Sequence, residues 1–531
     1  MRKTMKKAAG ILLAAAVMLG ITAPAQRAYA EETADSAITM PVSTDIKDIN
    51  VHLYAGSMVA QGMVFEGLVN YSPEGPVPAL AESWDISEDG KEYTFHIREG
   101  VTFTDGEVCD ANAIKQNFDA VLNNAEKHAW AVLTTTVDSV EAVDDLTLKL
   151  TLKDPYYPTL TELALIRPFR MMSPASFIDG ETKDGVSYIA GTGPYILKEH
   201  VEDQYAVFEA NPDYWAGEPA IKTVTLKVMP AGETTQLAFQ TGELNFLFGT
   251  YLNGMIDPSA VRALEADPAY QVTFSEPISS RFLLVNCDAN RPTGDLNIRQ
   301  AIWQSVNKEA MCDAILEGID VPAGKLFDDT MPYCAVELEE KPYDTDAARA
   351  LIEAAGYAMN DGTGYYEKDG AVLHIQLLYN NSAAANKTLC EYIQANLKDA
   401  GIETELVAAD KDAVYDMRSA GNYDILLDAS WGTPYDPQTC VTGILSNSSY
   451  APAFDELDSY QETCDALNAA LISTDEESRQ ELWTQVLTEM HENAWFIPVS
   501  YSRSSIITVP EMQNVCFGDT QYDVPFWKYS F

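Results

Sequence analysis

Residue patterns that support covalent chemistry are scarce in this chain. The sequence lacks the phosphate-loop pattern GxxxxGK[S/T], the zinc-helix pattern HExxH and the nucleophile pattern GxSxG. His491 and Glu492 begin a zinc-helix pattern, but no second histidine follows at the required spacing. The chain has 80 acidic residues, so pairs of carboxylates occur throughout and do not indicate an acid–base site. We therefore expect a protein that is not an enzyme.

Alternating periodicities predict a mixed α/β protein. Residues 93–97 and 146–152 alternate apolar and polar side chains as half-buried strands do, and a hairpin is expected between 93–97 and 101–103. Asp110 is the expected cap of a helix that follows it. The second half alternates helices with strands, which predicts a mainly parallel sheet. The expected helices there are 345–355, 387–400 and 476–491, and the expected strands are 373–377, 402–407 and 425–427.

Length and charge limit the classes of partner. A chain of 531 residues is too long for one hydrophobic core and predicts two or three domains. It carries 34 basic and 80 acidic side chains, a formal charge of −46 at pH 7. Such a field repels nucleic acid and anionic membrane surfaces, so neither is expected as a partner. We expect the acidic surface to keep an exported monomer in solution.

The first thirty residues predict export. Arg2, Lys3, Lys6 and Lys7 form a basic head, an apolar run covers 8–21, and Ala28-Tyr29-Ala30 supplies a cleavage pattern for signal peptidase. The mature chain is expected to begin at Glu31. No cysteine lies near that junction, which argues against a lipoprotein anchor and favours a periplasmic location over a secreted one. Eight cysteines occur without a CxxC pattern, so we expect mostly buried thiols, with one or two disulfides left open.

Five segments in order resemble one transport family. They resemble blocks of the extracellular solute-binding proteins of the oligopeptide and nickel ABC importers, family 5. The segments are residues 78–84 with 87–91, then 103–107, Gly191-Thr192-Gly193-Pro194-Tyr195, 211–215 and 297–302. The likeness covers nearly the whole mature chain. Residues 128–130, 167–170 and 431–437 are most similar to the nickel- and metallophore-binding branch.

This resemblance implies a fold with two lobes. It implies an α/β periplasmic-binding-protein fold of type II, in the large class with an extra subdomain in lobe I and a hinge between the lobes. Residues 1–30 are the expected signal peptide, 31–277 plus 499–531 lobe I, about 76–205 the extra subdomain, and 278–498 lobe II.

The resemblance also implies a ligand cleft between the lobes. The candidate ligand-binding residues are Arg167, Trp130, Trp431, Tyr435, Met58, Lys127 and His128. The planar guanidinium of Arg167 can hold a carboxylate through two hydrogen bonds, and the aromatic side chains can form flat walls around a chelate ring. The alternatives are ordinary core packing for the aromatic rings, a structural ion pair for Arg167 and a structural role for His128. We expect Arg170 to be structural.

Two departures from the branch change the expected metal chemistry. The well-known nickel binder of this branch uses a cleft histidine shortly after its Trp-Gly-x-Pro-Tyr segment, whereas here no histidine lies between Tyr435 and His491. The matching position is at or near Ser449. Lys127 also stands where that relative has arginine. Nickel favours imidazole nitrogen, so the metal is expected to arrive fully coordinated by a small chelator, with no metal ligand from the protein.

The expected function is therefore ligand capture for import. The protein would bind a nickel(II) chelate or metallophore and deliver it to the permease subunits of an ABC importer in the inner membrane. The alternative is an oligopeptide-binding protein of a peptide importer. No covalent cofactor is expected; haem has been associated with this branch, but the sequence shows no axial-ligand signature for it.

Overall fold

The computed structural model describes residues 36–531, apart from 54, 251–253, 382, 447–448 and 519. The expected signal peptide, 1–30, lies outside the described residues. Among the helices that are described, none has both the length and the apolar character needed to cross a membrane.

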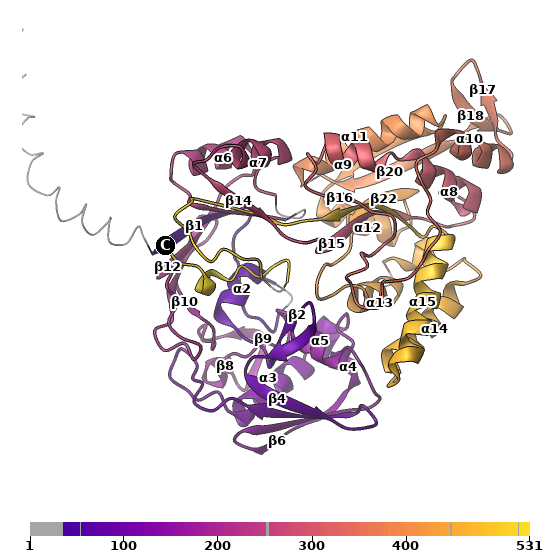
Figure 1. Ribbon diagram of the computed structural model, residues 1–531. Helices are drawn as coiled ribbons and strands as arrows, with labels where there is room; N and C mark the ends of the chain where they lie inside the picture. Colours follow the sequence, from indigo (N-terminus) through magenta and orange to yellow (C-terminus); the bar gives the residue numbers. More distant parts are fainter. Residues whose placement is uncertain (1–35, 54, 251–253, 382, 447–448, 519) are drawn as a thin grey trace, which may run out of the picture.

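A four-stranded sheet carries the N-terminal part of the chain (Figure 1). Its order is β1 (Ala37–Val42), β12 (Thr223–Val228), β11 (Tyr205–Ala210) and β10 (Tyr195–Val201). Ile38 and Met40 of β1 are buried with Val224 and Leu226 of β12, so one face of this sheet forms a core. A three-stranded sheet lies beside it, in the order β13 (Phe246–Gly249), β24 (Ser505–Thr508) and β14 (Gln271–Phe274). The helices of this part are α2 (Met58–Val64), α6 (Glu233–Gln240) and α7 (Pro258–Glu265).

A second sheet in the first half forms its own layer at the bottom of Figure 1. Its order is β4 (Ala81–Ile86), β5 (Glu92–Ile97), β7 (Thr147–Leu152) and β6 (Val137–Asp144). It is accompanied by the hairpins β2 (Val69–Ser72) with β3 (Gly75–Pro78) and β8 (Phe177–Ile178) with β9 (Glu181–Val186), and by α3 (Ala111–Leu122), α4 (Leu133–Thr136) and α5 (Thr159–Leu163). The cap predicted for α3 is confirmed, since the Asp110 carboxylate accepts a 2.8 Å hydrogen bond from Ala113 N–H. The predicted hairpin with 101–103 is wrong, because β5 pairs with β4 and β7 and Thr102 forms only an isolated bridge with Val108.

The second half forms a six-stranded sheet covered by helices. Its order is β16 (Val321–Pro322), β23 (Phe496–Ser502), β15 (Ser279–Val285), β22 (Ile425–Ala429), β20 (His374–Asn380) and β21 (Glu403–Ala409). The prediction of a mainly parallel sheet is wrong. Only β20 pairs in parallel, with β21 and β22, whereas β15 is antiparallel to both of its neighbours because β23 returns from the end of the chain.

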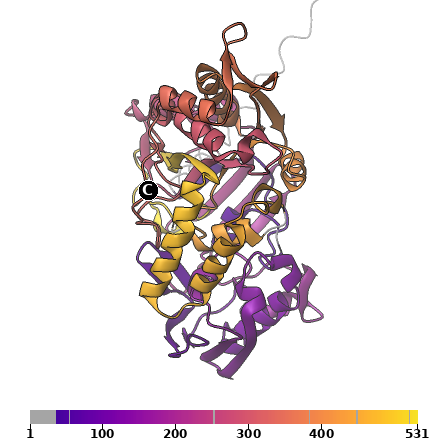
Figure 2. The same ribbon diagram turned by 90° about the vertical axis from the view of Figure 1, so that its right-hand side faces the viewer.

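The helices of this half are α8 (Leu296–Ser305), α9 (Lys308–Ala314), α10 (Thr345–Ala354), α11 (Ala384–Asp399), α12 (Lys411–Ser419), α13 (Gln438–Ser446), α14 (Tyr460–Ile472) and α15 (Glu476–Glu492). Figure 2 shows α14 and α15 side by side, and a small sheet of β17 (Ala358–Asn360), β18 (Tyr365–Lys368) and β19 (Ala371–Val372) projects beyond α10. Asp344 caps α10 as predicted, accepting from Asp346 N–H and Ala347 N–H.

The chain crosses between these two halves twice. One crossing joins β14 to β15, and the other joins β23 to β24. We infer that 275–278 and 503–504 are the hinge segments. The predicted boundary at 499 falls inside β23, and β10, placed in the predicted subdomain at 76–205, pairs in the β1 sheet instead. Below, lobe I denotes the parts before β15 and after β23, and lobe II denotes the part between them.

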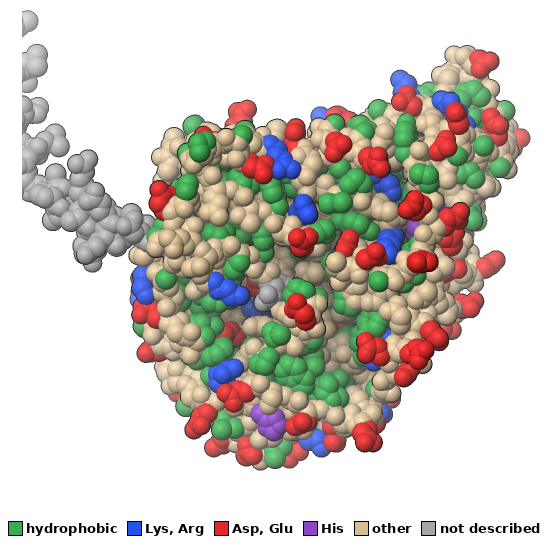
Figure 3. All heavy atoms as spheres, viewed as in Figure 1, with side chains coloured by type: hydrophobic (Ala, Val, Ile, Leu, Met, Phe, Trp, Pro, Cys, Tyr) green, Lys and Arg blue, Asp and Glu red, His purple; other side chains and the backbone are tan. Residues whose placement is uncertain are grey.

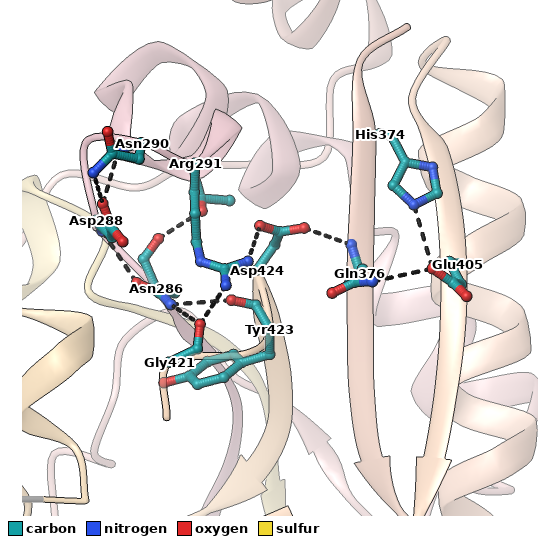
Figure 4. Close-up of polar contacts among 11 residues, drawn as sticks. Asn286, Asp288, Asn290, Arg291, His374, Gln376, Glu405, Gly421, Tyr423 and Asp424 are labelled. Atoms are coloured by element: carbon teal, nitrogen blue, oxygen red, sulfur yellow. Dashed lines mark hydrogen bonds and ion pairs between the residues drawn. The ribbon is translucent and has the colours of Figure 1, made fainter. Parts of the chain in front are cut away.

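A buried polar network fixes the entry to β22 in lobe II (Figure 4). The Asp424 carboxylate accepts hydrogen bonds from Arg291 Nη1 at 3.0 Å and from Gln376 N–H at 2.7 Å. Asn286 Nδ2 donates to the carbonyls of Gly421 and Tyr423, both at 3.0 Å. These hydrogen bonds fix the chain where β22 begins. At its other end, β22 leads into the segment 430–437.

The eight cysteines are all free thiols, and six of them are buried. The one or two disulfides that the sequence left open do not occur. Acidic side chains outnumber basic ones on the face shown in Figure 3, in keeping with the formal charge of −46.

Candidate ligand-binding site between the lobes

Three aromatic side chains predicted as cleft residues meet at the lobe junction. Trp130 follows a short 3-10 helix, η1 (Ala125–His128), in lobe I, whereas Trp431 and Tyr435 lie between β22 and α13 in lobe II. The ring centroid of Trp130 lies 6.4 Å from that of Trp431 and 6.2 Å from that of Tyr435. Trp431 and Tyr435 are 6.3 Å apart and nearly perpendicular. The structure thus brings together rings from two distant segments, one on each lobe.

Two glycines leave room for the ring of Trp431 and its loop. A Cβ at Gly443 in α13 would lie 2.2 Å from Trp431 Cη2. Gly432 has a φ of +75°, and a Cβ there would lie 2.6 Å from Gln521 Nε2, which itself donates to the Trp431 carbonyl. A larger residue at either position would displace the aromatic loop.

Arg167 lies in lobe I with 9% of its surface exposed, next to a cis peptide bond with Pro168. Its Nη1 donates a 3.0 Å hydrogen bond to the carbonyl of Ala55. Gln61 Nε2 in α2 donates to the same carbonyl at 3.0 Å, so this carbonyl joins Arg167 to the helix that Met58 begins. Met58 is half-buried at the start of that helix.

His128 and Lys127 differ although they are adjacent. His128 is fully buried, and its Nε2 donates a 2.8 Å hydrogen bond to the His52 carbonyl. Burial lowers the pKa of His128 and the nearby Arg167 charge lowers it further, so the imidazole is neutral at neutral pH. Lys127 is exposed, and its ammonium makes no hydrogen bond or ion pair with the described part of the chain. His128 therefore has a structural role through its hydrogen bond, whereas the ammonium of Lys127 has no such bond within the described residues.

Arg170 has the structural role expected for it. Its Nη1 donates to the carbonyl of Phe65 at 2.9 Å, and its Nη2 lies 3.7 Å from the Asp523 carboxylate. Only 6% of Arg170 is exposed. The pair joins the segment after Arg167 to the C-terminal tail.

That tail brings residues to the site that the sequence did not indicate. Tyr522 lies with its ring centroid 6.3 Å from that of Tyr435, at an interplanar angle of 86°. Gln521 bonds the Trp431 carbonyl, as described above. The tail has no motif and reads only as an extended segment, so nothing in its sequence marked these positions.

Ser449, at or near the position where the resemblance implies that the cleft histidine is missing, is held by an arginine. Arg418 Nη2 donates to Ser449 Oγ at 3.2 Å, and Arg418 Nη1 donates to Tyr450 Oη at 2.7 Å. Only 1% of Ser449 is exposed. This hydroxyl does not replace an imidazole as a nickel ligand.

The elements around the aromatic cluster carry buried polar atoms with spare bonding capacity. Buried side-chain polar atoms normally have a partner. The buried side-chain atoms without a partner in the described residues include Gln61 Oε1, Gln438 Oε1, Thr439 Oγ1, Thr442 Oγ1 and Gln521 Oε1. They lie on α2, which Met58 begins, on α13, which follows the loop of Trp431 and Tyr435, and on the tail that carries Tyr522. A polar ligand or ordered water could satisfy them.

The donor set does not form a metal centre. Among the residues that the structure describes, no three His, Cys, Asp or Glu side chains are grouped to hold a metal ion. A separate cavity of about 440 Å³ lies beside the hinge segments. Arg281, Asp320 and Arg503 are among its lining residues, and none of the predicted site residues lines it.

Comparison with known proteins decides the family. The family model described as bacterial extracellular solute-binding proteins, family 5 Middle, matches residues 75–452. The nickel-binding periplasmic protein of Escherichia coli (strain K12) is 36% identical over 501 residues, covering 93% of this chain and 94% of the relative. This chain belongs to the bacterial extracellular solute-binding proteins of family 5.

Other family 5 proteins show the range of ligands. The dipeptide-binding protein of Escherichia coli (strain K12) is 25% identical over 80% of this chain and 81% of its own. The crystal structure of NikA from Brucella suis in complex with Fe(III)-EDTA matches with a TM-score of 0.91 and 35% identity, covering 93% of this chain and all of that one. The two-lobed α/β fold expected for this family 5 protein is confirmed, and its relatives are transport proteins rather than enzymes.

Proposed function

We propose that this family 5 protein is the substrate-binding component of an ABC importer and that it captures a nickel chelate or metallophore. The observation that carries the proposal is the aromatic cluster at the lobe junction. Rings from both lobes meet there. The charge of Arg167 acts on His128, two residues before Trp130, and no metal-donor group is found among the described residues. Flat rings and an arginine suit a chelate whose carboxylates face outward from the metal.

Similarity to two relatives supports this ligand class. One relative at 36% identity is named a nickel-binding periplasmic protein, and another at 35% identity holds Fe(III)-EDTA, a metal wrapped in carboxylates. In our proposal Arg167 anchors a carboxylate, while Trp130, Trp431, Tyr435 and Met58 shape the cavity. Lys127 supplies charge at the rim, and His128 supports the lobe I wall from behind.

The mechanism is capture by closure. The lobes move about the two hinge segments, and a ligand between them stabilises the closed form because only that form contacts it from both sides. The closed protein then docks on the permease in the inner membrane. We propose that it acts as a monomer in the periplasm after the signal peptide is cleaved near Ala30.

Peptide import is the second candidate. It is favoured by the similarity to the dipeptide-binding protein, which covers 80% of this chain. Calorimetric titration separates the two functions: we expect a preformed complex of nickel with two L-histidine molecules to bind, and Ala-Ala to give no heat. Binding of the dipeptide without binding of the chelate would establish the second function instead.

A further inference from the structure

Three glutamine side chains beside the aromatic cluster are buried and anchored in the same way. Gln61 on α2, Gln438 on α13 and Gln521 on the tail are each at most 3% exposed. In each of them Nε2 donates a hydrogen bond to a backbone carbonyl. The carbonyls are those of Ala55 for Gln61 at 3.0 Å, Pro434 for Gln438 at 3.4 Å and Trp431 for Gln521. Since two facing carbonyl oxygens repel each other, these bonds fix which end of each amide is the oxygen.

The oxygen of each of these amides is enclosed without a donor. No described residue donates a hydrogen bond to Gln61 Oε1, Gln438 Oε1 or Gln521 Oε1. An amide oxygen accepts up to two hydrogen bonds. Leaving such an acceptor buried without a donor is unfavourable, and folded proteins rarely do so. A donor from outside the chain is therefore expected at these positions.

The three amides lie around one loop, residues 430–437. Gln438 follows this loop directly at the start of α13. The tail contacts the loop through the bond from Gln521 to the carbonyl within it. The tail also contacts α2, because a Cβ at Gly62 would lie 2.6 Å from the Asp523 carboxylate. The acceptors thus stand on neighbouring elements of both lobes, and one ligand that satisfies them contacts both.

A donor for carboxylates lies beside one of these acceptors. Arg167 Nη1 and Gln61 Nε2 donate to the same carbonyl, that of Ala55, each at 3.0 Å. A guanidinium that can hold a carboxylate therefore lies next to an amide oxygen that can accept from N–H. An amino acid bound to a metal presents both groups, a carboxylate and the N–H of its amine. A chelator made only of carboxylates and tertiary amines presents no N–H.

We propose that Gln61, Gln438 and Gln521 select the ligand by its N–H groups, so that the captured chelate contains an amino-acid chelator. This inference rests on the proposed function and narrows its ligand class. The amide oxygens accept from the amine or imidazole N–H groups of the chelator, while Arg167 holds a carboxylate. A chelate that offers only carboxylate oxygens leaves the amide oxygens without a donor and binds less favourably.

Titration calorimetry with two nickel chelates tests this selection. Nickel–bis-histidine carries amine and imidazole N–H groups, whereas nickel–EDTA has the same metal and carboxylates but no N–H. Gln438→Met keeps an unbranched side chain of similar length and removes the amide. We expect Gln438→Met to bind nickel–bis-histidine about 3- to 10-fold more weakly than wild type. It should bind nickel–EDTA at least as tightly, because EDTA has no donor for the amide oxygen.

The matched control is Gln304→Met. Gln304 Oε1 is also enclosed without a donor among the described residues, but it lies on α8, which Figure 1 shows apart from α13. This variant should bind both chelates as wild type does. If wild type does not bind nickel–EDTA, the comparison of Gln438→Met with Gln304→Met on nickel–bis-histidine decides alone.

Two results would overturn the proposal. One is wild-type affinity of Gln438→Met for nickel–bis-histidine, which would mean that water satisfies the amide. The other is an equal loss of affinity for both chelates, which would make the role of Gln438 structural. If Gln438→Met does not fold, Gln61→Met in lobe I gives the same comparison.

Failure of the proposed function gives a different result. In that case wild type binds neither nickel chelate, and the variants are titrated with Ala-Ala, whose ammonium group also donates N–H. Weaker binding of Ala-Ala by Gln438→Met than by Gln304→Met would still support selection by N–H. Equal binding of Ala-Ala by these two variants would overturn it.

Discussion

Trp483 Nε1 donates a 2.9 Å hydrogen bond to Tyr157 Oη and so joins lobe II to lobe I away from the aromatic cluster. Tyr157 N–H also donates to the Leu471 carbonyl at 3.1 Å. The ring of Tyr157 lies 5.6 Å from that of Tyr333 and 4.2 Å from the Arg479 guanidinium. The two lobes are thus joined at a second place, by residues other than those of the aromatic cluster.

Tyr157→Phe should weaken ligand binding without altering a ligand contact. The substitution leaves the buried Trp483 N–H without its acceptor in the closed form, a loss of about 1–2 kcal/mol. Opening the lobes relieves that loss, so the dissociation constant should rise roughly 5- to 30-fold. Titration calorimetry with the nickel–bis-histidine complex measures it.

The matched control for this change is Tyr205→Phe. Tyr205 donates to Glu199 on the exposed surface of lobe I and takes no part in the lobe junction. It should bind like wild type. Equal affinity of Tyr157→Phe and wild type would show that this contact does not affect closure.

Arg167→Ala should weaken capture strongly and leave the thermal midpoint nearly unchanged. A hydrogen bond to a charged group contributes about 1.5–3 kcal/mol, so the dissociation constant should rise roughly 10- to 150-fold. Arg167→Lys keeps the charge but loses the planar fork, so its affinity should lie between those of wild type and Arg167→Ala. Wild-type affinity in Arg167→Ala would remove this residue from the site.

Gly443→Ala should displace the ring of Trp431. The added methyl group would lie 2.2 Å from the ring, and overpacking of this kind is destabilising by about 1–3 kcal/mol. Thermal unfolding and titration should both show the loss, and Gly324→Ala, where no atom lies within 4 Å of the new methyl group, should show neither. A second change, Trp431→Phe, should restore stability to Gly443→Ala; failure to do so would contradict the assigned clash.

The raised pKa of Glu162 should make the free energy of unfolding depend on pH. Burial raises its pKa from an ordinary 4.5 to about 7, opposed by hydrogen bonds from Tyr156 and Leu133. As the pH rises, the Glu162 carboxyl ionises in the unfolded chain before it ionises in the folded protein. The stabilisation present below pH 4.5 is therefore lost as the pH rises through 7, and the total loss in unfolding free energy is on the order of 3 kcal/mol. The thermal midpoint should therefore fall less between pH 5 and pH 8 in Glu162→Gln than in wild type. Parallel curves for the two proteins would contradict the assignment.

Local signals predicted single elements well. Strict alternation gave β5 and β7, and the aspartates at 110 and 344 marked helix starts, because these features depend on neighbouring residues. Sheet direction depends on partners far along the chain. The strand β23 returns from residue 496 to pair with β15, and no local pattern encodes that pairing.

The sequence likewise predicted only some residues of the site. Resemblance singled out Trp130, Trp431 and Tyr435, and the structure brings them together. It did not reveal Tyr522, which reaches the site from a tail without a motif.

Native mass spectrometry of the mature protein tests the central claim most directly. Spectra are recorded with nickel alone and with nickel plus excess L-histidine. Capture of a chelate without a protein ligand predicts an added mass of one nickel and two histidines, and no adduct with nickel alone. A nickel adduct that forms without histidine, or copurified peptide masses with no nickel-dependent adduct, would contradict it.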